Sequence, residues 1–137
     1  DAQESRGLGD VYKRQDSGGP GTVRGGLGQT IVVRHADPQA GMIIAAAFDR
    51  VVHPARGALG GQAGAGGKLE LSSGAVLRAK GRQLIPAGER LVVHTPGGGG
   101  LGDPAERADA RLQRDVQYGL VSAAQAEDAY GRPVAPT

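Results

Sequence analysis

Glycine constrains this chain more than any other feature of its sequence, because 25 of the 137 residues are glycine and four of them are consecutive at 97–100. A glycine has no side chain to bury, and it loses more backbone freedom on folding than any other residue. With the eight prolines the share reaches about 24%, just below the roughly 25–30% at which aperiodic chains become disordered. We therefore expect one folded, loop-rich domain.

The core has to be built from aliphatic side chains, since the chain has one Phe, three Tyr and no Trp. Each fully buried Val, Leu or Ile contributes roughly 1.5–3 kcal/mol, whereas every glycine adds backbone entropy that folding must overcome. The sequence therefore predicts a thin core and a chain that depends on neighbouring protein for part of its stability.

The composition excludes several classes of function. Without cysteine, disulfide scaffolds, cysteine-ligated metal sites and thiol catalysis are excluded. The longest apolar run, Met42–Phe48, is far shorter than the roughly 18 residues of a membrane-spanning helix, so we expect no membrane segment. The net charge of +2 is spread along the chain without clustered Lys and Arg or stacking aromatic residues, and we expect no nucleic-acid partner.

Residues 1–15 differ from the rest of the chain. They show no sustained helical or strand period, and the string DVYKRQ at 10–15 resembles translated sequencing-adapter read-through. We expect a non-native or disordered segment there, with a flexible natural terminus as the alternative. The domain itself is expected to span 16–131, followed by a tail at 132–137.

The fold class expected for 16–131 is α+β, mainly β: an irregular glycine-rich antiparallel sheet followed by two short C-terminal helices. Leu69 and Leu71 alternate with charged residues and should share a buried face. Pro86-Ala87-Gly88 has the residues of a type II turn. The expected strands are Thr30–Arg34, Met42–Phe48, Lys68–Leu71, Ala75–Lys80 returning beside Lys68–Leu71 after a turn at 72–74, Leu84–Ile85 and Arg90–Thr95.

Both helices have start signals. Asp103 followed by Pro104 predicts the N-cap and first position of one helix, in which Leu112, Val116 and Leu120 form an apolar stripe that Gly119 ends or bends. The string SAAQ at 122–125 has the form of a capping box and predicts a second helix ending near residue 131.

The tetraglycine segment matches the glycine spacing of a dinucleotide-binding motif, but the residues around it do not fit such a site. Residues 97–102 read G-x-G-x-x-G, but Asp103 would put a carboxylate where a phosphate must sit, and Pro104 removes an amide donor. No strand with an acidic end follows about twenty residues later. The segment is then either a tight turn or a surface where bare backbone approaches a ligand or partner chain.

A charged candidate lies among the other glycines. Arg24 stands between SGGPG at 17–21 and GGLG at 25–28, where its guanidinium could clamp a carboxylate, carbonyl or phosphate oxygen, or equally pack against loop carbonyls. The three histidines lack metal-ligand spacing, and we expect no metal site. Catalytic residues are not identified, and the candidates for contact with substrate or with another subunit are Arg24, Gly25, Gly26, Gly97, Gly98, Gly99 and Gly100.

Five strings occur in a fixed order: SGGPGxxRGGLG at 17–28, GxxGG at 57–61, TPGGGGLGDP at 95–104, GLVS at 119–122 and AYG at 129–131. Together they resemble the C-terminal part of the hydantoinase B/oxoprolinase family, which includes N-methylhydantoinase B subunits, 5-oxoprolinases and acetone carboxylase alpha subunits. The resemblance covers about 16–131. Leu101 departs from the family pattern, because an aromatic residue is common there.

The resemblance implies a C-terminal fragment of the B subunit of an ATP-dependent cyclic amide hydrolase that opens a hydantoin or 5-oxoproline ring. A hydantoinase A-type subunit would use ATP to activate the ring carbonyl, in a cytoplasmic hetero-oligomer. ATP and a divalent metal are expected in the complete enzyme, none bound by this fragment, which we expect to be inactive alone. The alternatives are a fragment of an acetone carboxylase alpha-type subunit and a non-catalytic β-rich module for subunit interaction.

Overall fold

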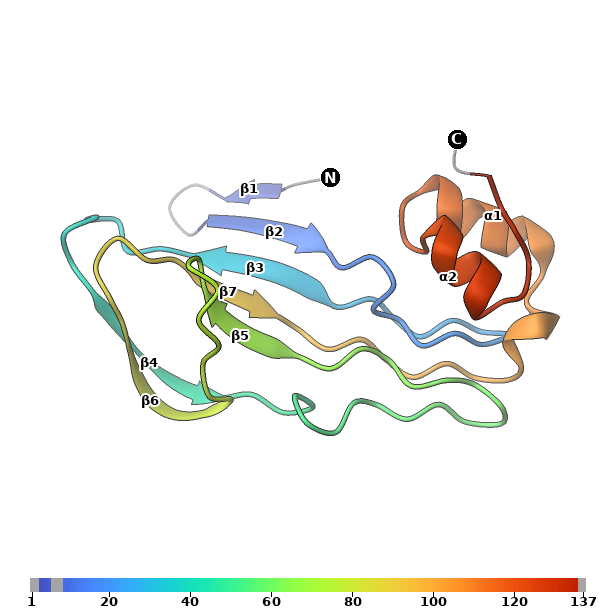
Figure 1. The fold of residues 1–137 in the computed structure, drawn as a ribbon, viewed down its shortest axis with the longest axis horizontal. Helices are drawn as coiled ribbons and strands as arrows, with labels where there is room; N and C mark the ends of the chain where they lie inside the picture. The colour runs from blue at the N-terminus through green and yellow to red at the C-terminus, as the bar shows by residue number, and fades with distance from the viewer. Residues whose placement is uncertain (1–2, 6–8, 136–137) are drawn as a thin grey trace.

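The computed structural model describes residues 3–5 and 9–135, so predictions for 1–2, 6–8 and 136–137 lie outside the described residues. Antiparallel strands come first along the chain and two short helices follow (Figure 1). The helices lie at one end of the long axis, and the strand pair β4–β6 lies at the other. This arrangement confirms the predicted fold class.

The larger sheet has the strand order β1-β2-β3-β7-β5, with each neighbouring pair antiparallel. Leu69 and Val93 are register partners and are both buried, as the alternation at 68–71 predicted. The predictions for three of these strands are confirmed to within one residue at each end. The strands are β1 (Gln3–Ser5), β2 (Gly9–Lys13), β3 (Gln29–Val33), β5 (Lys68–Leu71) and β7 (Leu91–His94).

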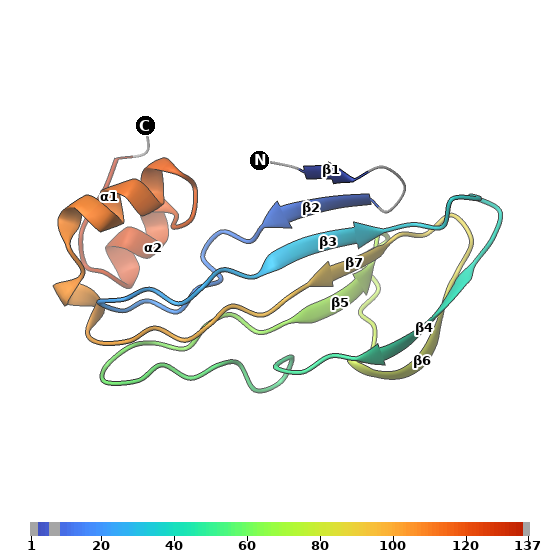
Figure 2. The same ribbon diagram turned by 180° about the vertical axis from the view of Figure 1, so that it is seen from behind.

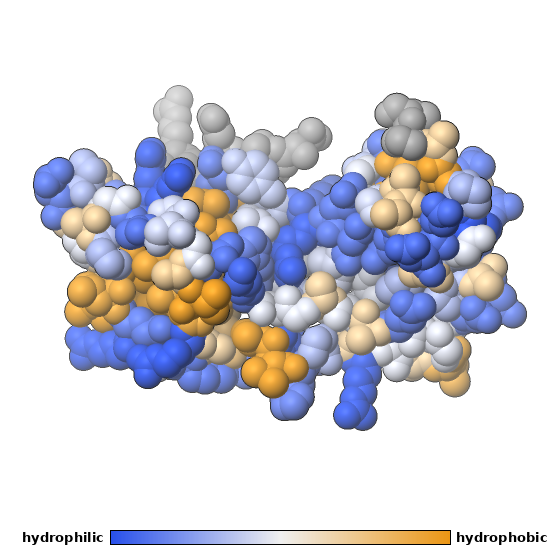
Figure 3. Space-filling model, viewed as in Figure 1, coloured by the Kyte–Doolittle hydropathy of each residue, from blue (hydrophilic) through white to orange (hydrophobic). Residues whose placement is uncertain are grey.

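A second sheet pairs β4 (Met42–Ala47) with β6 (Lys80–Ile85). Its inner face packs against the larger sheet, since Ile85 is fully buried and belongs to the same core cluster as Leu91 of β7. On the outer face Ile43 and Leu84 are register partners and are 59% and 63% exposed. Figure 3 shows apolar side chains gathered over this end of the molecule.

The predicted return strand Ala75–Lys80 is wrong. The turn before it forms, with Gly74 at φ +93° and the Leu71 N–H donating to the Ala75 carbonyl. Beyond it, the pairing with β5 is limited to an isolated bridge between Val76 and Glu70 and a bond from the Leu77 N–H to the Leu69 carbonyl at 2.9 Å. β5 has only four residues, so it offers a returning strand few backbone groups to pair with. The chain then forms β6, which pairs with β4.

Residues 1–15 show no strand period in their sequence, and the strands that the structure places there were not predicted. β2 pairs with β3 over three register positions, and Arg14 donates from its backbone N–H to the Gly28 carbonyl. The Arg14 guanidinium also donates to the carbonyls of Gly66 and Thr95. Part of this segment is thus integrated into the sheet, while its non-native origin stays a prediction.

The first predicted helix is divided into two. Asp103 is an N-cap, since its carboxylate accepts from the Ala105 N–H, but it caps only a short 3₁₀ turn, η1 (Pro104–Glu106). Arg107 and the residue after it are extended before α1 (Asp109–Gln117) begins. Gly119, at φ +70°, follows the end of α1, so Leu120 lies beyond the helix and not on its stripe.

The second helix, α2 (Ala123–Asp128), starts as predicted, because the Ser122 hydroxyl accepts from the Gln125 N–H. The return bond of a capping box is made by another residue: the Ser122 N–H donates to the carboxylate of Asp16 at 2.7 Å. α1 and α2 share a small core of Leu112, Val116, Val121, Ala126 and Tyr130.

Candidate functional site

Three glycine-rich segments run side by side between the sheets and the helices (Figure 2). We call them the glycine bundle: the first segment is 17–28, the second is 55–66 and the third is 95–102. They are extended but mostly outside regular strands, with isolated bridges from Leu101 to Val23 and to Ala58. The bundle therefore brings the predicted strings at 17–28, 57–61 and 95–102 into one structure.

The tetraglycine segment occupies the centre of the bundle and bonds with a three-residue repeat. The Gly97 N–H donates to the Ala65 carbonyl at 3.0 Å, and the Gly100 N–H donates to the Gln62 carbonyl at 2.9 Å. Both segments thus advance by three residues between bonds. The Gly98 N–H points elsewhere and donates to the first segment at 2.9 Å.

The neighbour that a Cβ atom would meet at each of these glycines follows the same three-residue repeat. A Cβ atom on Gly97 would come closer than 3.0 Å to the Ser17 carbonyl, and one on Gly99 would do so at the Arg56 carbonyl in the second segment. At Gly100 the neighbour is again the first segment. Three residues per turn is the repeat of a polyproline II-type helix, whose backbone groups bond to neighbouring chains and not within the helix.

The neighbouring segments carry a matching glycine spacing. Gly25 and Gly28 in the first segment, and Gly61 and Gly64 in the second, each place the missing Cβ closer than 3.0 Å to main chain of the third segment. The sequence signal for this packing is the repeated G-x-x-G spacing, which the strand-and-turn interpretation missed. As in collagen, only glycine fits where backbones approach this closely.

The predicted site glycines are therefore brought together, but mainly against backbone of the same chain. Gly25 is packed on Gly98, whereas Gly26 is exposed and a Cβ there would have no atom within 4 Å. Residues 97–100 are extended and not a tight turn, and their contact with a ligand or partner chain stays a prediction. Of the six candidate glycines, Gly25, Gly97, Gly98 and Gly100 donate their amides to backbone carbonyls. The amides of Gly26 and Gly99 donate to no backbone acceptor within the described ranges.

Arg24 turns toward the helices. Its Nη1 donates to the Gly25 carbonyl at 2.9 Å, and its Nε lies 3.4 Å from the Asp115 carboxylate. Packing against a loop carbonyl was one of the two interpretations of this residue, and a clamp on an external oxyanion remains a prediction. With 16% of its side chain exposed, Arg24 keeps limited contact with solvent.

Asp115 joins α1 to the bundle and was missed by the sequence analysis. It is 4% exposed and accepts from Arg107 at 3.0 Å and 2.8 Å, while Arg107 also donates to the Thr22 carbonyl. We call Arg24, Arg107 and Asp115 the Asp115 cluster. The available signal was the position of an aspartate beside Val116 on the buried face of α1.

Tyr130, from the string AYG, packs in the helical core close to this cluster and is 2% exposed. Burial raises the pKa of its phenol, the charge of Asp115 adds to that rise, and the guanidiniums of Arg107 and Arg24 oppose it. The phenol therefore stays neutral at ordinary pH and acts as part of the core.

On the larger sheet a hydrogen-bonded row crosses three strands. The Glu70 carboxylate lies 2.7 Å from the Lys68 ammonium and 2.9 Å from His94 Nε2, and His94 Nδ1 lies 3.0 Å from the Thr30 hydroxyl. Bonds from Lys68 first, and from His94 second, hold the pKa of Glu70 below its usual value. His94 therefore has a structural role, because its two ring nitrogens connect neighbouring strands of the sheet.

The lowered pKa of Glu70 predicts a pH dependence of stability. A carboxylate whose pKa is lower in the folded state stabilises the fold above its unfolded value of about 4.3, and that contribution is lost as the pH falls through the folded pKa. We expect Glu70→Gln to flatten the decline in unfolding free energy between about pH 5 and pH 3, measured by urea unfolding. Glu106→Gln, at an exposed carboxylate, is the control and should leave the decline unchanged.

Among the residues that the structure describes, no group of three or more His, Asp or Glu side chains is placed to hold a metal ion. None of the helices in the same part of the chain is long and apolar enough to cross a bilayer.

Comparison with known proteins was made by sequence and by fold. The family model for hydantoinase B/oxoprolinase matches residues 10–104. An uncharacterized protein of Methanocaldococcus jannaschii is 34% identical over 112 residues, which is 80% of this chain and 19% of that protein. The 5-oxoprolinase of Saccharomyces cerevisiae is 36% identical over 94 residues, which is 65% of this chain and 7% of that protein.

Two solved structures share the fold. An ATP-dependent caprolactamase from Pseudomonas jessenii aligns with a TM-score of 0.67 and 26% identity, over 91% of this chain and 23% of that one. A nucleotide-free acetone carboxylase aligns with a TM-score of 0.65 over 90% of this chain and 21% of that one, and at 18% identity it shows the fold alone. This chain thus spans about a fifth or less of the length of these relatives. Since the family model covers more than half of the chain, including the bundle, the chain belongs to the hydantoinase B/oxoprolinase family.

Proposed function

We propose that this chain is the glycine-rich part of the B component of an ATP-dependent cyclic amide hydrolase that opens a hydantoin or 5-oxoproline ring. The observation that carries the proposal is the family match over residues 10–104, which contains all three segments of the bundle. The 5-oxoprolinases and the caprolactamase among its relatives act, by their names, on cyclic amides. A hydantoinase A-type ATP-binding subunit would be the partner in a hetero-oligomer.

The bundle suits the role of a rigid backbone support. Its amides and carbonyls bond to one another, so the loops are held without a large apolar core. Among the candidate glycines, Gly26 and Gly99 differ from the others, because their amides donate to no backbone acceptor in the described part of the chain. Such amides can donate to a carbonyl oxygen of a partner chain or to an oxygen that gains charge during ring opening. We therefore assign contact with substrate or partner to the Gly26 side of the bundle.

The described residues do not fit a divalent metal, since no cluster of three or more His, Asp or Glu side chains is present among them. Asp115, a buried carboxylate beside the bundle, is neutralised by two guanidiniums. We therefore assign ATP and metal binding to other parts of the complete enzyme, and no turnover is expected from the 137-residue chain alone.

A chimera tests the proposal. The 94 matched residues of the yeast 5-oxoprolinase are replaced by those of this chain, and ATP-dependent hydrolysis of 5-oxoproline is measured beside that of the isolated chain. We expect hydrolysis by the chimera within about tenfold of the parent enzyme, a loss of under about 1.4 kcal/mol in transition-state stabilisation, and none by the isolated chain. A chimera that folds and assembles like its parent without turnover would contradict the proposal, as would turnover by the isolated chain.

The non-catalytic module is separated from the catalytic role by one variant of the same chimera. Gly26→Val adds a side chain at the exposed glycine, where nothing in this chain opposes it. Reduced turnover with unchanged size in gel filtration supports contact between the bundle and the reacting ring. Loss of assembly supports the interaction module, for which the exposed pair Ile43 and Leu84 offers an apolar surface.

A further inference from the structure

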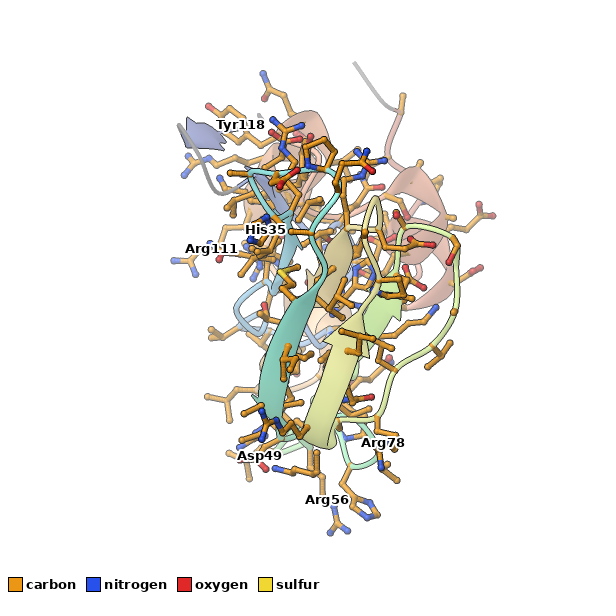
Figure 4. The ribbon with its side chains drawn as sticks, turned by 90° about the vertical axis from the view of Figure 1, so that its left-hand side faces the viewer. His35, Asp49, Arg56, Arg78, Arg111 and Tyr118 are labelled. Atoms are coloured by element: carbon orange, nitrogen blue, oxygen red, sulfur yellow. The ribbon has the colours of Figure 1, made fainter. Side chains whose placement is uncertain are left out.

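A surface cavity of about 310 Å³ lies at the end of the molecule opposite the helices, between the loop after β3 and the turn before β7. Figure 4 looks onto this end and labels His35 at the loop. The cavity is lined by His35 and by four charged side chains, those of Arg34, Asp37, Glu89 and Arg90. The volume is at the lower end of the roughly 300–1,000 Å³ of small-molecule sites.

Two of the residues that line the cavity are arginines next to the ends of paired strands, Arg34 after β3 and Arg90 before β7. Val33 pairs with Leu91 in the β3–β7 ladder, so extending the register by one residue puts Arg34 opposite Arg90. Neither guanidinium makes a hydrogen bond or an ion pair within the described part of the chain. Like charges at directly opposed positions destabilise a sheet, unless an anion lies between them.

His35 supplies a further donor. His35 Nδ1 lies 3.0 Å from the Asp37 nitrogen and 3.1 Å from the Asp37 carbonyl oxygen, so the tautomer of the ring decides whether Nδ1 accepts or donates. In the tautomer in which Nδ1 accepts from Asp37, the Nε2 N–H has no hydrogen-bond partner within the described residues and can donate to a ligand. The cavity therefore combines two guanidinium forks with an imidazole N–H, which is the donor set for an oxyanion with several oxygens.

The two carboxylates of the cavity are already engaged. Asp37 accepts from the Gln39 N–H at 2.9 Å, and Glu89 accepts from the hydroxyl and N–H groups of the turn at 72–73. Neither lies within ion-pair distance of Arg34 or Arg90 in the described part of the chain. The pKa of Glu89 is lowered first by its hydrogen bond from Ser72, then by Ser73, and least by the charge of Arg90. Their charges limit the affinity for a bare anion and favour a ligand that also carries a hydroxyl or ammonium donor.

We propose that this cavity binds the phosphoryl group of a small molecule, held by Arg34, Arg90 and His35. The site lies at the far end of the sheets from the glycine bundle and is independent of the function proposed above. Three donors from separate residues match the three free oxygens of a phosphate monoester, whereas a carboxylate offers two.

Isothermal titration of the full chain with inorganic phosphate, in a phosphate-free buffer of low ionic strength, tests the proposal. We expect saturable binding with a Kd of roughly millimolar, weakened at least about tenfold by Arg34→Gln or Arg90→Gln. Amide chemical shifts should move at 34–37 and 88–90. Absence of saturable binding, or shifts spread over the whole chain, would overturn the site.

Two controls make the result specific. Arg111→Gln removes the same charge from an exposed position on α1 (labelled in Figure 4) and should leave the affinity for phosphate unchanged. If it weakens binding as much as Arg34→Gln, the binding reflects net charge and the proposal is wrong. Acetate is the carboxylate probe, and binding as tight as that of phosphate would overturn the assignment to a phosphoryl group.

Discussion

Replacing Asp115 with alanine should lower the free energy of unfolding by about 3–5 kcal/mol, with a fall of roughly 10–20 °C in Tm. Arg107 is 7% exposed, and removal of the carboxylate leaves its guanidinium buried without a counter-ion. The same carboxylate is the ion-pair partner of Arg24, so the variant also loosens the first segment from α1. Against a typical total stability of about 5–15 kcal/mol, this change can unfold the chain.

A second aspartate on the same helix provides the control. Asp109 forms an ion pair with Arg132, but its side chain is 76% exposed, so Asp109→Ala should cost about 0–1 kcal/mol. Urea unfolding of both variants measures the difference. If the two aspartates prove equally dispensable, the Asp115 cluster does not hold the helices to the bundle. A double-mutant cycle with Arg107→Ala then measures the coupling directly, and it should be well above 0.5 kcal/mol.

The second large effect concerns two adjacent glycines with opposite expectations. A Cβ at Gly25 would come closer than 3.0 Å to the carbonyls of Gly98 and Gly99, which are backbone and cannot rotate away. Gly25→Ala should therefore force the first and third segments apart and cost at least about 3 kcal/mol, from overpacking together with broken hydrogen bonds. The Cβ atom added by Gly26→Ala would have no atom within 4 Å. This substitution should leave stability unchanged or raise it by about 0.4–1 kcal/mol, because alanine restricts the unfolded chain.

Hydrogen exchange identifies where the change acts. In Gly25→Ala the amide of Gly98, which donates across to the Gly26 carbonyl, should lose protection, whereas Gly26→Ala should preserve it. Equal protection and equal unfolding free energies in the two variants would show that the bundle tolerates a side chain at its centre, and the polyproline II-type packing would be refuted.

Much of the fold follows from local sequence patterns. The alternation at 68–71, the glycine of the turn at 86–88, and the capping residues Asp103 and Ser122 each act within a few residues, and each is confirmed. The turn closes with a bond from the Glu89 N–H to the Pro86 carbonyl. Predictions failed where a partner distant in sequence decides the outcome, as for the strand expected at 75–80, which required a longer β5 beside it.

The candidate site shows the same division. The sequence identified Gly25 and the tetraglycine segment, because consecutive glycines are costly and require a structural reason. It could not show that they pack on one another, since the approach of Gly25 to Gly98 depends on how two distant segments align. Asp115 was missed for a similar reason: its bond to Arg24 joins residues 91 positions apart.

The sequence by itself determined the fold class, the positions of turns and caps, and the family, because these depend on side-chain type and spacing along the chain. Only the tertiary structure decided what the glycines contact, which carboxylate is buried, and that Arg34 and Arg90 line one cavity. Backbone packing without side chains leaves almost no periodic signal of hydrophobicity, and a buried ion pair is recognised only when both partners are placed. Physical contact between distant segments therefore had to be seen in space.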